Sequence, residues 1–307
     1  MKPPVNIFGA HYREKYGEPV AKIALDTGIL CPNRQKGGCV FCRQDSFMPY
    51  YMKNRSSFEG QLEEGRAHLK ARGVGIYFAY FQQETPTAAP LPQLMSMVSL
   101  ALQDPQCIGI IISTRPDYVQ ASLLKELSET VVGRAKRELL IELGLQSMYE
   151  ATLEMLNRNH TFDDFVDAAR LIRRFPDIQL GVHLILGLPG EDFNHMRLTV
   201  MTVADMGINY VKLHHLQILK DTRLLSLYGK SPFRLYTAEE YLELLAELLP
   251  CLPYRVVVHR LCNTTSPDLI AYPQWNMNAG ALYVALVKLM TERGLVQGKE
   301  VDRDENE

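Results

Sequence analysis

The sequence contains no apolar run that approaches the roughly 18 residues of a membrane-spanning helix. Its opening residues lack the apolar stretch of a secretory signal, so we expect a cytoplasmic protein that does not enter a membrane. A strong excess of one charge is also missing. The formal net charge is −2, which is not that of a nucleic-acid binder that is basic throughout. With 47% hydrophobic residues, the composition is that of a globular protein with a large core.

Charge is nevertheless distributed unevenly along the chain. Residues 1–55 hold nine Lys or Arg against four Asp or Glu, whereas the final residues, KEVDRDENE, are acidic. The basic segment is either an ordinary solvated surface or a contact for an anionic partner. The acidic residues predict a solvated, disordered tail over 298–307.

β-branched segments alternate with helical patterns through most of the chain. The expected strands are 22–28, 75–81, 108–114, 138–146, 178–187 and 210–219. The expected helices are 58–73, 91–103, 118–130, 162–175 and 241–249. Because several strands are almost continuously apolar, they suit a parallel sheet that is covered on both faces. The alternation predicts an α/β fold with right-handed crossovers, either a barrel or a doubly wound sheet.

The same pattern divides the chain into four parts. We expect an N-terminal segment (1–20), a core (21–225), a C-terminal extension packed on the barrel (226–297) and the acidic tail. The extension contains a strand-like segment, 255–261, and a final apolar helix at about 278–293.

Three of the six cysteines lie close together, in the loop after the first expected strand. Cys31, Cys39 and Cys42 form a C-x7-C-x2-C pattern. A structural zinc site normally has four ligands, and the nearest candidate for a fourth, His11, lies twenty residues upstream. Three cysteines suit an iron–sulfur cubane with one iron left open for chemistry, although zinc stays an alternative on this pattern alone. The other three cysteines, Cys107, Cys251 and Cys262, are expected to be small buried hydrophobes. A place in a C-terminal substrate pocket is the alternative for Cys262.

Segments at the later strand ends carry a resemblance to a known family. In chain order they are FQQETPT (81–87), STRPDY (113–118), ELGLQS (142–147) with LNRNHT (156–161), HLILGLPGED (183–192) and KLHHLQILKDTRL (212–224). The first resembles a segment of oxygen-independent coproporphyrinogen oxidases, and the second the ETRPD segment of the Elongator catalytic subunit. With HRLCNTTSP (259–267), the chain is identified as a member of the radical S-adenosylmethionine (radical SAM) superfamily, similar to its YhcC-like, Elongator-related proteins.

The resemblance implies a partial (β/α)6 TIM-type radical SAM barrel with a small C-terminal extension. It implies a 4Fe–4S cluster held by the three clustered cysteines, and S-adenosylmethionine (SAM) bound at the open iron. Reductive cleavage of SAM then yields a 5′-deoxyadenosyl radical that takes hydrogen from a substrate. The residues that the resemblance places near SAM are Gln83, Glu84, Thr85, Ser113, Arg115, Gln146, Arg158 and His183.

Two of these positions depart from the related families. Ser113 stands where Elongator-type proteins have Glu, so a carboxylate contact is lost there. At the position of His183 the porphyrinogen oxidases carry an acid. Elongator-like proteins carry a histidine there, as this chain does. His214 and His215 follow each other on one strand, so only one of them faces the barrel interior.

The Elongator-like motifs and the basic N-terminal segment favour an enzyme that modifies the C5 substituent of a tRNA wobble uridine. The alternative is a radical enzyme for a small metabolite, for example a porphyrin-type decarboxylation. A third reading is a zinc-binding RNA module without catalysis. The expected partners are a flavodoxin- or ferredoxin-type electron donor and, on the first reading, tRNA.

Overall fold

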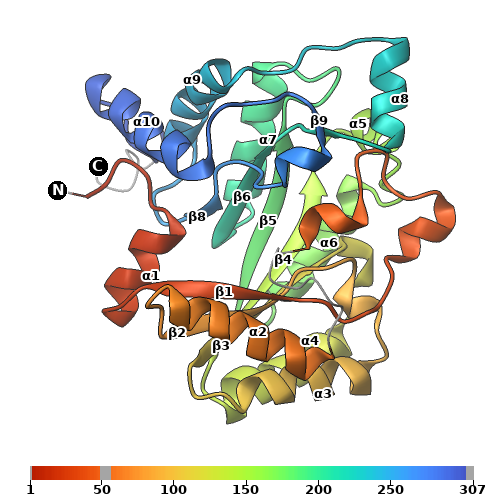
Figure 1. Ribbon diagram of the computed structural model, residues 1–307, viewed down its shortest axis with the longest axis vertical. Helices are drawn as coiled ribbons and strands as arrows, with labels where there is room; N and C mark the ends of the chain where they lie inside the picture. Colours follow the sequence, from red (N-terminus) through yellow and green to blue (C-terminus); the bar gives the residue numbers. More distant parts are fainter. Residues whose placement is uncertain (1, 49–56, 302–307) are drawn as a thin grey trace.

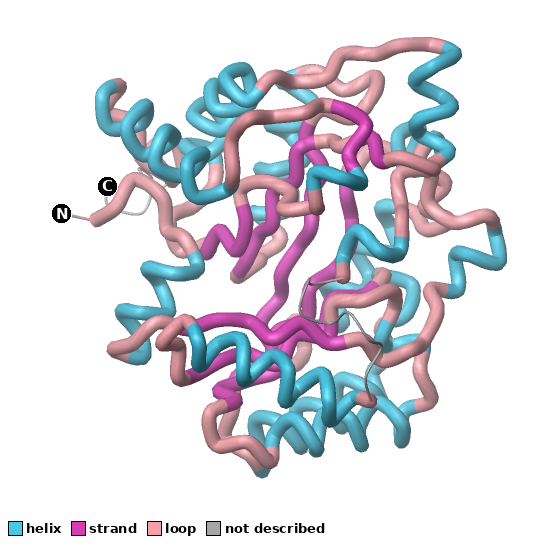
Figure 2. Tube along the Cα trace, viewed as in Figure 1, coloured by secondary structure: helices cyan, strands magenta, loops and turns pink. Residues whose placement is uncertain are grey.

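The computed structural model describes residues 2–48 and 57–301, and its centre is a sheet of seven parallel strands (Figure 1). The strands are β1 (Val20–Leu25), β2 (Ile76–Phe81), β3 (Cys107–Thr114), β4 (Glu138–Gln146), β5 (Ile178–Leu186), β6 (Tyr210–His215) and β8 (Val257–Arg260). Each strand pairs with the next one along the chain, and the order never reverses. A doubly wound sheet reverses its strand order at a switch point, so this order belongs to a partial barrel. Figure 2 shows the strands curling around a common axis.

All six expected strands form, but their ends differ and a seventh joins them. The segment expected as one strand over 210–219 ends at His215, and β7 (Ile218–Leu219) pairs antiparallel with β9 (Ile270–Tyr272) in a separate small sheet. The seventh parallel strand, β8, comes from the segment that the sequence assigned to the C-terminal extension, and it pairs with β6. The barrel therefore has one strand more than expected.

Helices cover the outer face of the sheet. Following the strands are α2 (Phe58–Ala71), α3 (Leu91–Leu102), α4 (Ala121–Leu127), α5 (Glu150–Met155), α6 (Phe162–Ile172), α7 (Phe193–Asp205), α8 (Arg223–Lys230), α9 (Ala238–Leu248) and α10 (Ala279–Glu292). The helix expected over 118–130 is shorter, because a π-helical segment takes over from Ser128 to Arg134. Capping boxes start α6 at Thr161 and α9 at Thr237.

Side chains alternate between two cores along each strand, as the period of two requires. In β2, Tyr77, Ala79 and Phe81 pack outward under the helices, while Phe78 and Tyr80 point into the barrel. The helix α1 (Phe8–Tyr16) closes the amino-terminal end of the barrel with Tyr12, which is fully buried. Because Tyr12 and the aromatic residues around it fill the amino-terminal end, the cavity of the barrel opens toward the carboxyl ends of the strands.

The C-terminal part packs against the barrel through one continuous apolar core. Tyr241 of α9 and Leu282 of α10 belong to the same cluster as the outward-facing residues of the sheet. The first residues of the acidic tail are hydrogen-bonded, since the amide of Glu300 donates to the carbonyl of Pro250 at 3.0 Å. The remainder of the expected tail, 302–307, lies outside the described residues.

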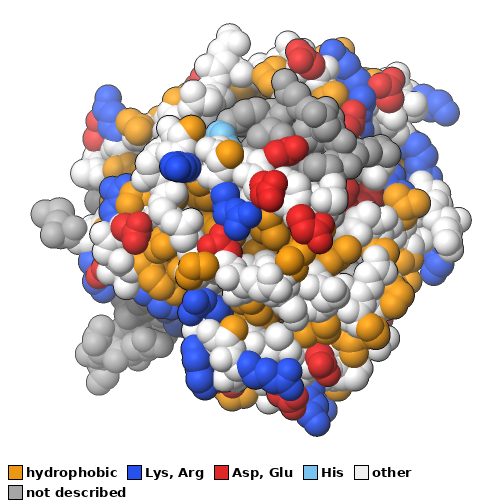
Figure 3. Space-filling model, turned by 60° about the horizontal axis from the view of Figure 1, so that its bottom comes forward, with side chains coloured by type: hydrophobic (Ala, Val, Ile, Leu, Met, Phe, Trp, Pro, Cys, Tyr) orange, Lys and Arg blue, Asp and Glu red, His pale blue; other side chains and the backbone are white. Residues whose placement is uncertain are grey.

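No helix in the described part of the chain is long and apolar enough to cross a membrane. The face that comes forward when the bottom of Figure 1 is turned to the viewer mixes basic, acidic and apolar side chains (Figure 3).

Candidate active site

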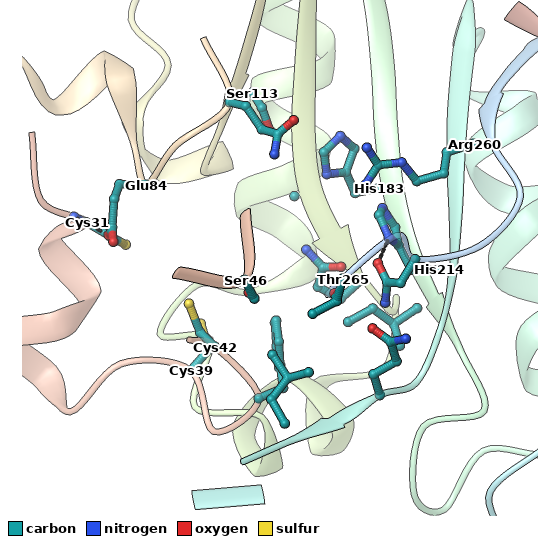
Figure 4. A pocket seen from close by; sticks show the side chains of 18 of the residues that line it. Cys31, Cys39, Cys42, Ser46, Glu84, Ser113, His183, His214, Arg260 and Thr265 are labelled. Carbon is teal, nitrogen blue, oxygen red and sulfur yellow. Dashed lines mark hydrogen bonds between the residues drawn. The ribbon is translucent and has the colours of Figure 1, made fainter. Parts of the chain in front are cut away.

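A cavity of about 340 Å³ lies at the carboxyl ends of the strands, where α/β-barrel enzymes carry their active sites. Its walls come from the ends of β1 to β6 and β8 and from the cysteine loop (Figure 4). All of the site residues expected from the sequence line it except Gln83; they are Cys31, Cys39, Cys42, Glu84, Thr85, Ser113, Arg115, Gln146, Arg158 and His183. Gln83 is buried behind the wall, where its side-chain oxygen and nitrogen have no hydrogen-bond partner.

The three clustered cysteines are half-buried and face the same cavity. Burial raises the pKa of the Cys42 thiol to about 12. Within residues 2–48 and 57–301, no three His, Cys, Asp or Glu side chains converge closely enough to hold one metal ion. Zinc needs all of its sulfur ligands about 2.3 Å from a single point. A cubane uses one thiolate for each of three irons, so it suits thiols that share a cavity without converging on one point.

Asparagines of the cysteine loop itself and of the LNRNHT segment hold this loop in place. Asn33 donates through Nδ2 to Cys39 Sγ at 3.2 Å and to the carbonyl of Asn157 at 2.8 Å. Asn157 donates in turn to the carbonyls of Lys36 and Gly38. Asn157 has φ of 52°, a left-handed conformation that asparagine tolerates better than most residues. These contacts tie the cysteine loop to the end of α5.

The two arginines expected near SAM are largely committed to this scaffold. Arg158 donates to Cys39 Sγ at 3.2 Å, to the carbonyl of Gly144 at 2.5 Å and to His160 Nε2 at 3.1 Å. Arg115 pairs with Asp117 and donates to the carbonyl of Arg158 at 2.8 Å. Burial and the Arg158 charge lower the pKa of His160 to about 4, so this imidazole is neutral and accepts.

Glu84 joins the second strand end to the cysteine loop. Its backbone has φ of 59°, and its carboxylate accepts from the amide of Cys31 at 2.9 Å and pairs with Arg34 at 2.5 Å. Because the Glu84 carboxylate is already paired, residues 83–85 can contact a ligand through their backbone. The hydroxyl of Thr85 lines the cavity and is buried without a partner.

A buried charge network that the sequence analysis did not identify lies deeper in the barrel. Glu142, which is 1% exposed, pairs with Lys212 at 2.6 Å and with His183 Nε2 at 3.0 Å. Lys212 also donates to the Tyr80 hydroxyl at 2.5 Å, and His259 Nδ1 lies 3.1 Å from Glu142. The signal for this network was a charged residue in the interior of each of two expected strands, Glu142 in 138–146 and Lys212 in 210–219.

These contacts set the protonation of the network. Burial raises the pKa of Glu142, but the Lys212 charge and the bonds to His183 and His259 outweigh it and hold that pKa well below its usual range. Burial, followed by the Lys212 charge, lowers the pKa of His183 to about 4. The network thus consists of a carboxylate and an ammonium, with neutral imidazoles beside them.

The structure distinguishes the two adjacent histidines. His214 faces the interior, where its ring lies 5.5 Å from that of His183. His215 stacks on Trp275 with ring centroids 3.8 Å apart, and its pKa falls to about 3 because of burial. His214 therefore belongs to the barrel interior, whereas His215 anchors the C-terminal part.

Comparison with known proteins identifies the family. Residues 28–203 match the radical SAM superfamily, and residues 208–290 match the radical SAM C-terminal domain. The chain belongs to the radical SAM superfamily. It is a radical SAM enzyme, and its cofactors are a 4Fe–4S cluster and SAM. The non-catalytic zinc module considered from the sequence is therefore wrong.

Individual relatives agree with the YhcC-like, Elongator-related resemblance. The YhcC protein of Escherichia coli is 31% identical over 97% of this chain and 96% of its own. A tRNA uridine(34) acetyltransferase of Methanocaldococcus infernus is 26% identical over 193 aligned residues. The alignment covers 62% of this chain and 34% of that relative, about a third of its length. The structure of archaeal Elp3 from the same organism superposes with a TM-score of 0.67 at 18% identity, covering 91% of this chain and 64% of its own. The partial radical SAM barrel expected from the sequence is confirmed.

The residues present fit the cofactors of a radical SAM enzyme. Three thiols share the cavity, and two of them have donors nearby: Arg34 Nη2 is 4.0 Å from Cys42 Sγ, and Arg158 and Asn33 reach Cys39. Hydrogen bonds to sulfur tune and stabilise such clusters. The partnerless Thr85 hydroxyl beside the cysteine end suits a polar group of a ligand.

Proposed function

We propose that this radical SAM enzyme modifies the C5 substituent of the wobble uridine, position 34, in tRNA. The relative named a tRNA uridine(34) acetyltransferase supports this proposal, because its similarity covers 62% of the chain. The Elongator-like motifs at the strand ends, above all STRPDY and LNRNHT, support it as well.

Within this function, Cys31, Cys39 and Cys42 would hold the cluster, and Glu84 and Thr85 would contact SAM through their backbone. When bound, the cluster and SAM supply a 5′-deoxyadenosyl radical that takes a hydrogen atom from the substrate. Gln146 and Ser113 line the cavity and orient its ligands. A hydrogen bond to Glu142 fixes the His183 ring in the cavity wall. The cavity walls keep water away from the reacting atoms.

The cavity of about 340 Å³ also has to take the cluster and SAM, so it admits only a small group of the substrate and excludes a folded RNA stem. A wobble base must therefore leave its stack to reach the cavity. Extrusion costs less for a base in a single-stranded anticodon loop than for one in a duplex. Such a reaction belongs in the cytoplasm. A small flavodoxin- or ferredoxin-type protein supplies the electron that every radical SAM enzyme requires.

Exposed lysines beside the cavity are the candidates for phosphate contacts. Lys36 lies in the cysteine loop, and Lys220 follows the cavity-lining Leu219. Arg43 joins their two loops by donating to the carbonyl of Lys220 at 2.9 Å. Neither lysine forms an ion pair with a described residue, so both are available to an RNA backbone. Two further basic residues suggested by the sequence, Lys53 and Arg55, lie outside the described residues.

RNA binding is tested with an anticodon stem-loop at several salt concentrations. The double variant Lys36→Ala/Lys220→Ala should bind more weakly, and its affinity should depend less steeply on salt because fewer counterions are released. Lys288→Ala is the matched control, because Lys288 is 76% exposed on α10. Equal affinity of wild type and double variant at every salt concentration would count against this surface.

The reaction itself is tested by comparing a deletion strain with its parent. An altered modified nucleoside at position 34, restored by the wild-type gene and not by a Cys39→Ala gene, supports the proposal. Unchanged nucleosides together with an accumulated soluble metabolite would replace it by the small-molecule alternative.

A further inference from the structure

Arg260 ends β8 and extends its side chain into the cavity beside His183 and His214 (Figure 4). It is only partly exposed, yet it forms no hydrogen bond or ion pair with any residue that the structure describes. A guanidinium carries five donors and a fixed positive charge, so leaving it unpaired in a cavity is costly. This makes Arg260 different from Arg115 and Arg158, whose donors are occupied.

The carboxylates near Arg260 are already occupied. Both oxygens of Glu142 are taken, one by Lys212 and His183 and the other by His259. Glu84, the only carboxylate among the described residues that line the cavity, is paired with Arg34 at the cysteine end. No carboxylate among the described residues that line the cavity is left to balance Arg260, so an oxyanion of a ligand fits beside it.

His214 adds a second unmet requirement next to Arg260. The Nδ2 of Asn263 donates to the carbonyl of His215 at 3.0 Å, which orients the Asn263 amide so that its Oδ1 accepts from His214 Nδ1. With the proton on Nδ1, His214 Nε2 is an acceptor, and this atom is buried without a partner. Burial and the Arg260 charge hold the pKa of His214 well below its usual range, so the ring stays neutral.

We propose that Arg260 and His214 form a substrate subsite that binds an oxyanion, a carboxylate or a phosphate, next to a hydrogen-bond donor. Arg260 grips the oxyanion with its forked donors, and His214 Nε2 accepts from a neighbouring N–H or O–H group. In Figure 4 this subsite lies across the cavity from the cysteines, beyond His183. The ligand is therefore a group of the substrate, because the carboxylate of SAM binds at the cluster end. This inference rests on the proposed function only in assigning the oxyanion to a modified uridine.

The first experiment uses simple anions and does not depend on any uridine. Acetate and inorganic phosphate are added to the reconstituted enzyme, with chloride at equal ionic strength as the reference. Wild type should show a rise in melting temperature with at least one of the two anions. Arg260→Met should lose that rise, and Arg293→Met, which removes an arginine at the C-terminal end of α10 that pairs with Glu243, should keep it. Equal responses in wild type and Arg260→Met would overturn the subsite.

The second experiment identifies the source of the oxyanion. Dissociation constants are measured for 5-carboxymethyluridine, its neutral amide and uridine 3′-phosphate. A wild-type preference for the carboxylate over the amide, lost by about 10- to 100-fold in Arg260→Met, assigns a carboxylate on the substituent. If Arg260→Met weakens only the binding of uridine 3′-phosphate, the oxyanion that Arg260 binds is a nucleotide phosphate. Arg260→Lys keeps the charge and should retain part of the preference, whereas circular dichroism and iron content check that each variant folds.

The two experiments separate the subsite from the proposed function. If the simple anions respond to Arg260 and none of the uridines binds, the oxyanion subsite stands and the uridine assignment fails. If wild type responds to no simple anion and does not prefer a charged uridine over the neutral amide, the subsite is overturned, whatever the tRNA experiments show.

Discussion

Arg158 donates a hydrogen bond from its guanidinium to the Sγ atom of Cys39 at 3.2 Å. The same guanidinium reaches the carbonyl of Gly144 at the end of β4 and His160 in the loop after α5. One buried side chain thus joins Cys39, a proposed cluster ligand, to the barrel wall. Arg158 is a positioning residue for the cysteine loop as well as a wall of the cavity.

Replacing Arg158 by Lys should weaken retention of the cluster. A single ammonium cannot meet three acceptors in the geometry of the guanidinium fork. Loss of such an outer contact typically lowers metal affinity by about 10- to 100-fold. We expect faster iron loss to a chelator, measured by absorbance, with Arg293→Lys as the control. Identical rates in the two variants would show that the contact to Cys39 is dispensable.

Replacing Cys31, Cys39 or Cys42 by Ala should abolish both the bound iron and the formation of 5′-deoxyadenosine with dithionite and SAM. Cys251→Ala is the matched control, because Cys251 is buried away from the cavity beside Glu300. Iron, sulfide and 5′-deoxyadenosine are measured after anaerobic reconstitution. A variant lacking any of the three cysteines that still holds a full cluster would remove that residue from the ligand set.

Glu142→Gln should destabilise the fold strongly, because it leaves Lys212 charged and buried in the barrel. Breaking a buried ion pair from one side typically costs about 3–5 kcal/mol. Both side chains are at most 2% exposed, so solvent screens them little. The melting temperature should fall, and the double variant Glu142→Gln/Lys212→Met should recover part of the loss. A double variant less stable than Glu142→Gln would argue against an uncompensated Lys212 as the cause.

Stability should decline below about pH 6.5 because of buried neutral histidines, of which His215 is the clearest. Burial lowers its folded pKa to about 3, from the 6.5 that is usual for an exposed histidine. Between these values the unfolded chain binds a proton that the folded chain does not, so acidification favours unfolding. His215→Phe keeps a ring against Trp275 and should reduce the pH slope of the unfolding free energy by about 1.4 kcal/mol per unit within this window. Denaturant unfolding at pH 4.5 and 5.5, where the unfolded imidazole is protonated and the folded one is not, measures it, and an unchanged slope would contradict the assignment.

Gly65→Ala should destabilise the protein although alanine favours helices. A Cβ at Gly65 in α2 would lie 2.3 Å from the Ile23 Cγ2 atom of β1, and overpacking of this kind typically costs about 1–3 kcal/mol. Gly229→Ala in α8 is the control, because its Cβ would meet nothing within 4 Å and should stabilise by roughly 0.5–1 kcal/mol. Melting temperatures that move in the same direction for both variants would contradict the close packing of α2 on β1.

Much of the fold was readable from local patterns. The apolar strands and the motifs at their ends are short-range features, and they indicated six of the seven parallel strands and a site at their carboxyl ends. The pairing of β8 with β6 was not readable, since it joins residues as far apart in the chain as Tyr210 and Val257 and depends on tertiary packing. The break after His215 was missed for the same reason, because β7 pairs with the distant β9.

The sequence alone determined the cysteine spacing, the order of the strand-end motifs and hence the family, because each of these is carried by residues close together in the chain. Only the tertiary structure decided which side chains meet inside the barrel. It turned Arg158 toward Cys39, buried Gln83 and separated His214 from His215. It also left Arg260 without a hydrogen bond or ion pair to any described residue. These outcomes depend on the curl of the sheet and the register between strands, which bring residues such as Glu142 and Lys212 together from positions 70 residues apart.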